Sequence, residues 1–229
     1  MKKIAVLLPL LAVLPMSAAT WEAGVFVGQQ TFHSDSSFAT AINPGQGYKV
    51  DSKTDFGFRL GRSLVDFGPV NFELTAGYMA PVTSTFTQTI GTTGATGTFK
   101  AQSYSVGAMF NLKAMFAVGA GLEYRFEKLD RTFAASYTAG ETGTGALSFN
   151  GDSSSNLARP WFRVNIGYAL PTPVIKPFIG LEADFPLASK SVDGGLTQNV
   201  GSVVTIPNDV INKAIAPKAQ IGIYAGLRF

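Results

Sequence analysis

Charged residues are scarce in this chain, and nine of them fall at alternate positions of strand-like segments. Alternate side chains share one face of a β-strand, so these carboxylates and guanidinium groups are expected on one surface. Charges removed from water persist only when they are paired, which predicts a network of ion pairs that braces the fold, lines a polar path or relays protons. The nine residues are Glu22, Arg59, Glu73, Glu123, Arg125, Arg163, Glu182, Asp184 and Arg228.

Distances from the intervening turns suggest specific partners within this set. A turn centred in "PTPV" (171–174) places two of the charges opposite each other, and the first and last segments bring together two more. A third pair lies about equally far from the turn "VDFGP" (65–69). The predicted pairs are Arg163 with Glu182, Glu22 with Arg228, and Arg59 with Glu73.

A second chemistry is suggested by His33, the only histidine, which precedes Ser34, Asp35 and Ser36. Serine, histidine and a carboxylate are the groups of a hydrolase triad, as in outer-membrane lipid deacylases and phospholipases. The His-x-Ser spacing of those enzymes is absent, because Asp35 occupies the serine position. We therefore predict no catalytic centre, and a lipid esterase is the least favoured alternative. One histidine and no cysteine also predict neither a metal site nor a cofactor.

The N-terminal residues have the features of a secretory signal peptide. Lys2 and Lys3 precede an apolar run too short to span a bilayer, and Ser17, Ala18 and Ala19 offer small residues for cleavage. We predict a signal peptide over 1–19 and one domain over 20–229. Removal of two lysines lowers the net charge from +3 to +1, which predicts no nucleic-acid partner.

The whole chain is apolar, with a mean hydropathy of +0.19 and 14% charged residues, against about 25% in typical domains. Eight segments alternate between apolar and polar or glycine residues, and short links alternate with long ones. These features predict an all-β protein, an eight-stranded antiparallel up-and-down transmembrane β-barrel. The expected strands are 20–32, 55–64, 70–80, 103–112, 115–127, 161–170, 177–187 and 221–229.

The apolar face carries aromatic residues near both ends of these segments, as expected for two membrane interfaces. The ten residues from Phe116 to Phe126 span roughly 25 Å at ~3.3 Å per residue and a ~40° tilt, which matches the apolar band of an outer membrane. The expected girdles are Trp21, Phe72, Phe110, Phe116, Tyr168 and Phe229 at the short-turn end, and Phe56, Tyr78, Tyr104, Phe126, Phe162 and Phe185 at the long-loop end.

The chain ends on an apolar alternation that finishes with phenylalanine: Ile221, Ile223, Ala225, Leu227 and Phe229. In this feature and in its eight alternating segments, it resembles the small eight-stranded outer-membrane barrels of the OmpA transmembrane domain and OmpX type, with OmpW-like barrels as the nearest rival. The resemblance covers 20–229. It implies that the last strand is an insertion signal read by the barrel-assembly machinery of a Gram-negative cell envelope.

The resemblance also implies a structural or surface-interaction role, adhesin-like, in a monomer that contacts outer-membrane lipid and reaches an extracellular ligand through its long loops. The alternative is a narrow OmpW-like or porin-like channel for small solutes or hydrophobic molecules. A ten-stranded barrel, with an added hairpin in 131–151, also remains open.

Three local expectations concern the long-loop end. The uncharged, β-prone segment 83–98 is expected to extend two strands well above the membrane. Asn208 is expected to cap a short helix in 208–215. Pro81 and Pro186 are expected to end their strands, because proline cannot donate to the hydrogen-bond ladder.

Overall fold

The computed structural model describes residues 21–32, 47–67, 69–90, 93–113, 116–138, 146–170, 172, 175–188, 197–200, 204–207 and 216–229. The predicted signal peptide, His33 with its neighbours, and the expected helix at 208–215 lie outside these residues. No helix among the described residues is long and apolar enough to cross a membrane.

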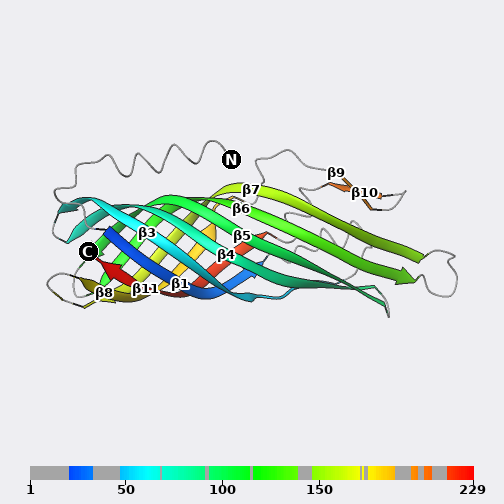
Figure 1. The fold of residues 1–229 in the computed structure, drawn as a ribbon, viewed down its shortest axis with the longest axis horizontal. Coiled ribbons are helices and arrows are strands. Elements are labelled where there is room, and N and C mark those ends of the chain that lie inside the picture. Colours follow the sequence, from blue (N-terminus) through cyan, green and yellow to red (C-terminus); the bar gives the residue numbers. More distant parts are fainter. Residues whose placement is uncertain are drawn as a thin grey trace.

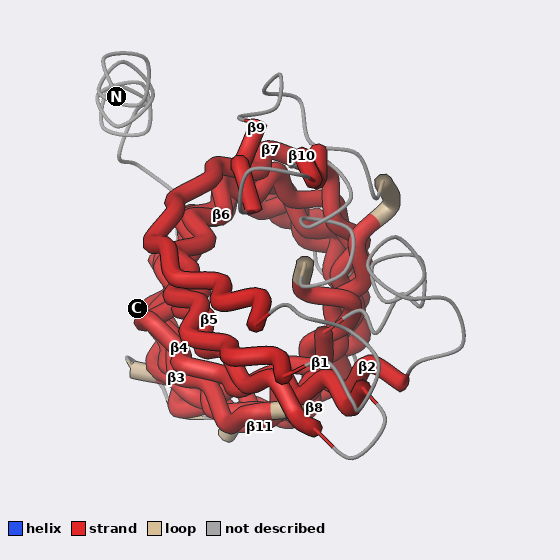
Figure 2. Tube along the Cα trace, turned by 90° about the vertical axis from the view of Figure 1, so that its right-hand side faces the viewer, coloured by secondary structure: helices blue, strands red, loops and turns tan. Residues whose placement is uncertain are grey.

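Eight antiparallel strands close into a barrel, in the order β1-β3-β4-β5-β6-β7-β8-β11 and back to β1 (Figures 1 and 2). Closure removes every sheet edge within the barrel wall. These strands are β1 Trp21–Phe32, β3 Lys53–Phe67, β4 Val70–Ile90, β5 Thr93–Lys113, β6 Ala117–Thr138, β7 Ala146–Ala169, β8 Lys176–Pro186 and β11 Pro217–Arg228. The predicted fold class is confirmed.

Three shorter strands lie outside the barrel wall. β2 (Gly47–Val50) pairs with the outer part of β4, and β9 (Thr197–Val200) pairs with β10 (Val204–Pro207). The ten-stranded alternative is wrong, because 131–138 and 146–151 do not add strands to the wall. They lengthen β6 and β7, which stay paired as far as Thr138 and Ala146.

The connections differ in length between the two ends of the barrel. At one end, where the chain also terminates, β3–β4, β5–β6 and β7–β8 are joined across 68–69, 114–116 and 170–175 (Figure 1). We call this the short-turn end. At the opposite end, β4 to β7 continue past the other strands, and Figure 1 shows them projecting beyond the barrel. We call 83–90, 93–98, 130–138 and 146–156 the extension.

Burial in the wall is the reverse of that in a water-soluble protein. Charged side chains such as Glu123 and Arg125 are buried inside, whereas Leu122 and Leu181 are 56% and 60% exposed outside. A contiguous apolar surface of this kind needs an apolar solvent, and a lipid bilayer provides one. Phe26 is an exception to the apolar–polar pattern of the first strand, because it is an apolar residue that faces inward and is buried.

The aromatic residues form cross-strand rows on the outside. Phe72 lies opposite Phe110 near the short-turn end, and Tyr104 lies between Tyr78 and Phe126 near the other end. The rings of Tyr78 and Tyr104 are 5.0 Å apart. Of the twelve expected girdle residues, nine are clearly exposed, while Trp21, Tyr78 and Phe126 are half-buried.

Small residues on the inner face make room for large ones. A Cβ atom on Gly24 would lie 2.5 Å from the ring of Tyr224, which is a strand away on β11. Glycine is therefore needed at this position for Tyr224 to lie flat inside the barrel. This explains why the inward face alternates glycine with bulky polar residues.

Prolines lie at the rim where the barrel gives way to the extension. Pro186 is the last residue of β8, as predicted. The expectation for Pro81 is wrong: β4 continues to Ile90, and the register between β4 and β5 shifts between Met79 and Val82. A β-bulge accommodates a residue without an N–H, so the strand passes through Pro81 instead of ending.

Candidate functional site: the charged lumen

Charged side chains from seven of the eight wall strands converge inside the barrel, and several contacts cross it. At the short-turn end, the Tyr224 hydroxyl donates to Glu22 Oε1 at 2.7 Å. Arg228 forms an ion pair with the other oxygen of Glu22. Glu22 and Arg228 are also direct cross-strand partners between β1 and β11, so this pair joins the two strands that close the barrel.

Glu182 on β8 is the centre of the network. Arg59 Nη1 donates to both of its oxygens, at 2.6 and 2.7 Å, and Arg163 Nε donates at 2.9 Å. Arg59 also lies 3.8 Å from Glu123. Since Arg59 is on β3, with β1 and β11 between it and β8, this contact ties opposite parts of the wall together.

A second group lies nearer the extension. Arg125 forms ion pairs with Glu123 and Asp184, and its Nη1 donates to Gln220 at 2.7 Å. The Gln220 amide donates in turn to Asp55. These contacts link β6, β8, β11 and β3, and each of the five side chains is at least nine-tenths buried.

Trp161 separates this group from the next ion pair. Two guanidinium groups lie close to its ring, with Arg125 Cζ 4.1 Å and Arg159 Cζ 5.0 Å from the ring centre. Arg159 donates to Glu127 through Nε at 2.7 Å and through Nη2 at 3.1 Å, and Nη2 also donates to the Pro217 carbonyl at 2.6 Å. The aromatic face stabilises two like charges that would otherwise repel each other.

The structure places all nine predicted charges inside the barrel, but it changes some of the partners. Glu22 pairs with Arg228, and Arg163 pairs with Glu182 diagonally, because the residue directly opposite Arg163 is Asp184. Arg59 lies opposite Gly77 and not Glu73, since Glu73 faces Ser63 and the register shifts just beyond it. Glu73 instead accepts a hydrogen bond from Asn111 at 3.2 Å.

Four buried charges were missing from the predicted set: Asp55, Arg62, Glu127 and Arg159. Three of them continue the inward alternation, and Arg159 was missed because β7 begins well before the expected residue 161. Arg62 could not be found in this way, because it has the parity of outward-facing Leu60. It is buried with its guanidinium 5.2 Å from the centre of the Trp21 ring.

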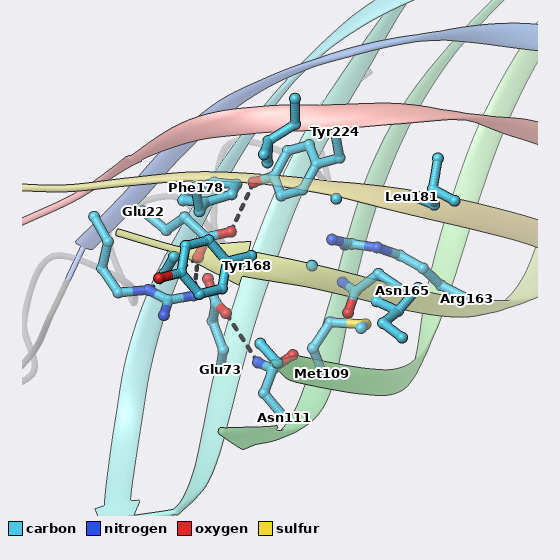
Figure 3. A pocket seen from close by; sticks show the side chains of 17 residues that line it. Glu22, Glu73, Met109, Asn111, Arg163, Asn165, Tyr168, Phe178, Leu181 and Tyr224 are labelled. Carbon is cyan, nitrogen blue, oxygen red and sulfur yellow. Dashed lines mark hydrogen bonds and ion pairs between the residues drawn. The ribbon is translucent and has the colours of Figure 1, made fainter. Parts of the chain in front are cut away.

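A small cavity lies in the lumen at the short-turn end (Figure 3). Its volume is about 40 Å³, enough for a few water molecules and too small for an organic substrate. Figure 3 shows Glu22, Glu73, Asn111, Arg163 and Tyr224 around it. Arg163 Nη1 is buried without a hydrogen-bond partner among the described residues, so a water molecule in this cavity would accept a hydrogen bond from it.

The predicted insertion signal lies on the outer face of β11. Ile221, Ile223, Leu227 and Phe229 are 47–58% exposed, and Ala225 is half-buried. The backbones of Phe229 and Trp21 exchange two hydrogen bonds, at 2.7 and 2.9 Å. The last residue therefore belongs to the seam that closes the barrel.

The described residues contain no group of three or more acidic, histidine or cysteine side chains that could hold a metal ion. What they do contain is a closed eight-stranded wall, an apolar outer belt between aromatic rows, and an interior filled with paired charges. The chain has the fold of the small eight-stranded outer-membrane β-barrels.

Comparison with solved structures finds similar barrels at low sequence identity. Ail, the attachment invasion locus protein of Yersinia pestis, in complex with the heparin analogue sucrose octasulfate, is 13% identical, with a TM-score of 0.44 over 92% of this chain and 99% of Ail. Neisserial surface protein A is 10% identical, with a TM-score of 0.40 over 93% of this chain and 98% of that protein. No family model and no curated protein matches the chain.

Proposed function

We propose that this protein is a non-catalytic outer-membrane barrel whose work is done by its extension, which makes contacts outside the cell. The observation that carries the proposal is the pairing of β4 with β5, past a bulge, as far as Ile90 and Thr93, and of β6 with β7 as far as Thr138 and Ala146. From Phe126 to Thr138, β6 runs about 40 Å beyond the aromatic row at ~3.3 Å per residue.

The chemistry of the strands changes where the extension begins. Between the aromatic rows, the outward residues are apolar, as Leu122 and Val118 show. Above them, Lys128 and Asp130 form an exposed ion pair of 3.0 Å. A paired sheet whose outer face turns polar at its base, as these residues show, is suited to contact with aqueous partners.

The lumen favours a supporting role over transport. Contacts such as Arg59 with Glu182 span it, and the cavity at its short-turn end has room for only a few water molecules. Among the described interior residues, seven buried carboxylates share the lumen with five guanidinium groups at inward-facing positions, and most of these charges form ion pairs, as a bracing network requires. We infer that the barrel is a monomeric anchor in outer-membrane lipid, exported through a cleaved signal peptide.

The experiment that tests this role removes part of the extension and leaves the barrel intact. Cells displaying the full chain, or a variant lacking 84–98, are counted on an epithelial cell layer and on a heparin-coated surface. We expect the trimmed variant to lose retention on at least one of them by tenfold or more. Heat-modifiable gel migration, with equal surface amounts, checks that the variant has folded. Equal retention of a folded trimmed variant would contradict the proposal.

A further inference from the structure

An apolar layer lies across the inside of the barrel at the rim, directly above the charged lumen. Its members are among the most buried residues of the molecule, and each is exposed by no more than 8%. We call this layer the apolar plug. It consists of Phe32, Val82, Phe99, Leu129, Leu157 and Ala216.

The plug is joined across the lumen and not only along the wall. The rings of Phe32 and Phe99 meet edge to face, with their centres 4.8 Å apart. Phe32 is on β1 and Phe99 is on β5, with β3 and β4 between them in the wall. Their contact therefore bridges the inside of the barrel.

Cross-strand register extends the layer around the wall. Val82 on β4 lies opposite Ala101 on β5, and Ala101 lies opposite Leu129 on β6. The next inward residues down β5 and β6 are polar, since Ser103 lies opposite Glu127, which is paired with Arg159. On β4 the next inward residue is Met79, which is buried and packs with Phe26 and Tyr224. Along β5 and β6, the inner face thus changes from apolar to polar within one inward-facing position.

At the opposite end of the lumen, the described residues mix apolar side chains such as Met109 and Phe178 with polar ones. The cavity at the short-turn end is bordered by Glu22, Glu73, Asn111 and Asn165, and Arg163 directs an unpartnered N–H group into the lumen there. Charged and amide groups replace the hydrogen bonds of a water molecule or the hydration shell of an ion. A constriction lined by apolar side chains offers neither, and it excludes both water and ions by dewetting.

We propose that the apolar plug is the seal of this barrel. It keeps water and solutes on the extension side out of a lumen whose polar half communicates with the short-turn side. The ion pairs brace the wall, and the plug excludes water. This inference rests on the proposed function, because a seal has meaning only for a barrel that does not transport.

The chain contains no cysteine, so single cysteines report solvent access directly. Ser103→Cys lies just below the plug, and Asn165→Cys lines the cavity. Ser154→Cys and Ile175→Cys mark the extension side and the short-turn side, because both positions are exposed. Each variant is refolded into lipid vesicles and treated with a membrane-impermeant maleimide on one side at a time.

With the plug intact, we expect Asn165→Cys to react from the short-turn side and Ser103→Cys to resist reagent from the extension side. Adding Phe99→Ser and Leu129→Ser should make Ser103→Cys react from the extension side at least tenfold faster. Leu187→Ser is the matched control, because Leu187 lies just beyond β8 and is 58% exposed. Glu182→Gln is the second control, because it weakens the ion-pair network and leaves the plug unchanged.

Two results would overturn the inference. One is a Ser103→Cys that reacts from the extension side as fast as Ser154→Cys while the plug is intact. The other is a folded plug variant in which Ser103→Cys stays protected, whether or not the separate Glu182→Gln control exposes it. If the variant with Phe99→Ser and Leu129→Ser does not show heat-modifiable migration, Leu129→Ala is used instead. We then expect Ser103→Cys to react faster from the extension side, but by a smaller factor. Loss of surface retention is measured separately, so a failed proposed function is distinguishable from a failed seal.

Discussion

The same four strands, β4 to β7, pass through two regions in which charged residues lie on opposite faces of the sheet. Inside the barrel wall, Glu123 and Arg125 point inward and are paired, while Leu122 faces lipid. At the base of the extension, Asp130 instead pairs with Lys128 on the outer face. Backbone pairing is continuous through both regions, so the level of the membrane is set by which face carries the charge and not by where the strands end.

The largest difference in stability between the two regions is expected on removal of the Glu182 carboxylate, which two arginines share. Glu182→Ala leaves Arg59 and Arg163 buried without their closest partner. Breaking a buried ion pair costs about 3–5 kcal/mol, so we expect a loss of that size in urea unfolding followed in lipid vesicles. Thr98→Ala, on the exposed extension, should change the unfolding free energy by less than about 0.5 kcal/mol. Comparable losses at the two sites would contradict a bracing lumen.

A charge placed on the outer face tests where the lipid-facing wall ends and the extension begins. Leu122→Arg puts a guanidinium in the middle of the apolar belt, where it should destabilise the barrel by about 2–4 kcal/mol. Thr98→Arg puts the same group on the same side of the sheet above the rim, where it should be tolerated. The unfolding free energies of both variants in vesicles measure the difference. A tolerated Leu122→Arg would show that this face does not meet lipid.

The last residue tests the seam of the barrel. Phe229 is 58% exposed, so Phe229→Ser removes little packing, and we expect a change of less than about 1 kcal/mol in the refolded protein. Its predicted role is recognition by the barrel-assembly machinery. The amount of folded protein in the outer membrane of expressing cells should therefore fall several-fold, while refolding in detergent is unchanged. Equal amounts of parent and variant in cells would remove that role.

The smallest expected effect is at the base of the extension. A hydrogen bond from Ser154 and the nearby Lys128 ammonium hold the pKa of the Asp130 carboxyl below its ordinary value of 3.8. A lowered pKa stabilises the folded hairpin at neutral pH, and this contribution is lost as pH falls below about 4. Asp130→Asn should abolish that acid-range loss of amide-exchange protection in β6 and β7. An unchanged acid profile in Asp130→Asn would assign the loss to other carboxylates.

Sequence alternation predicted the strand number, the closed barrel and the inward charges, because a period of two determines which face each residue occupies. It did not predict the partners. Glu73 and Arg59 are separated by register and bulges, which depend on backbone pairing along the whole strand. Trp161 and the plug residue Phe99 were missed as well. Trp161 lies in an expected strand at the parity of Arg163, but an apolar side chain was not expected on that face. Phe99 was missed because β5 begins at Thr93, well before the expected residue 103.

The measurement that tests the account most directly is single-channel conductance of the refolded protein, residues 20–229, in a planar bilayer. The account describes a braced and sealed barrel that anchors an extension. It predicts no discrete current steps from protein whose heat-modifiable migration shows that it has folded. Reproducible steps that change with Arg163→Ala would contradict it, and the lumen would then be a solute path.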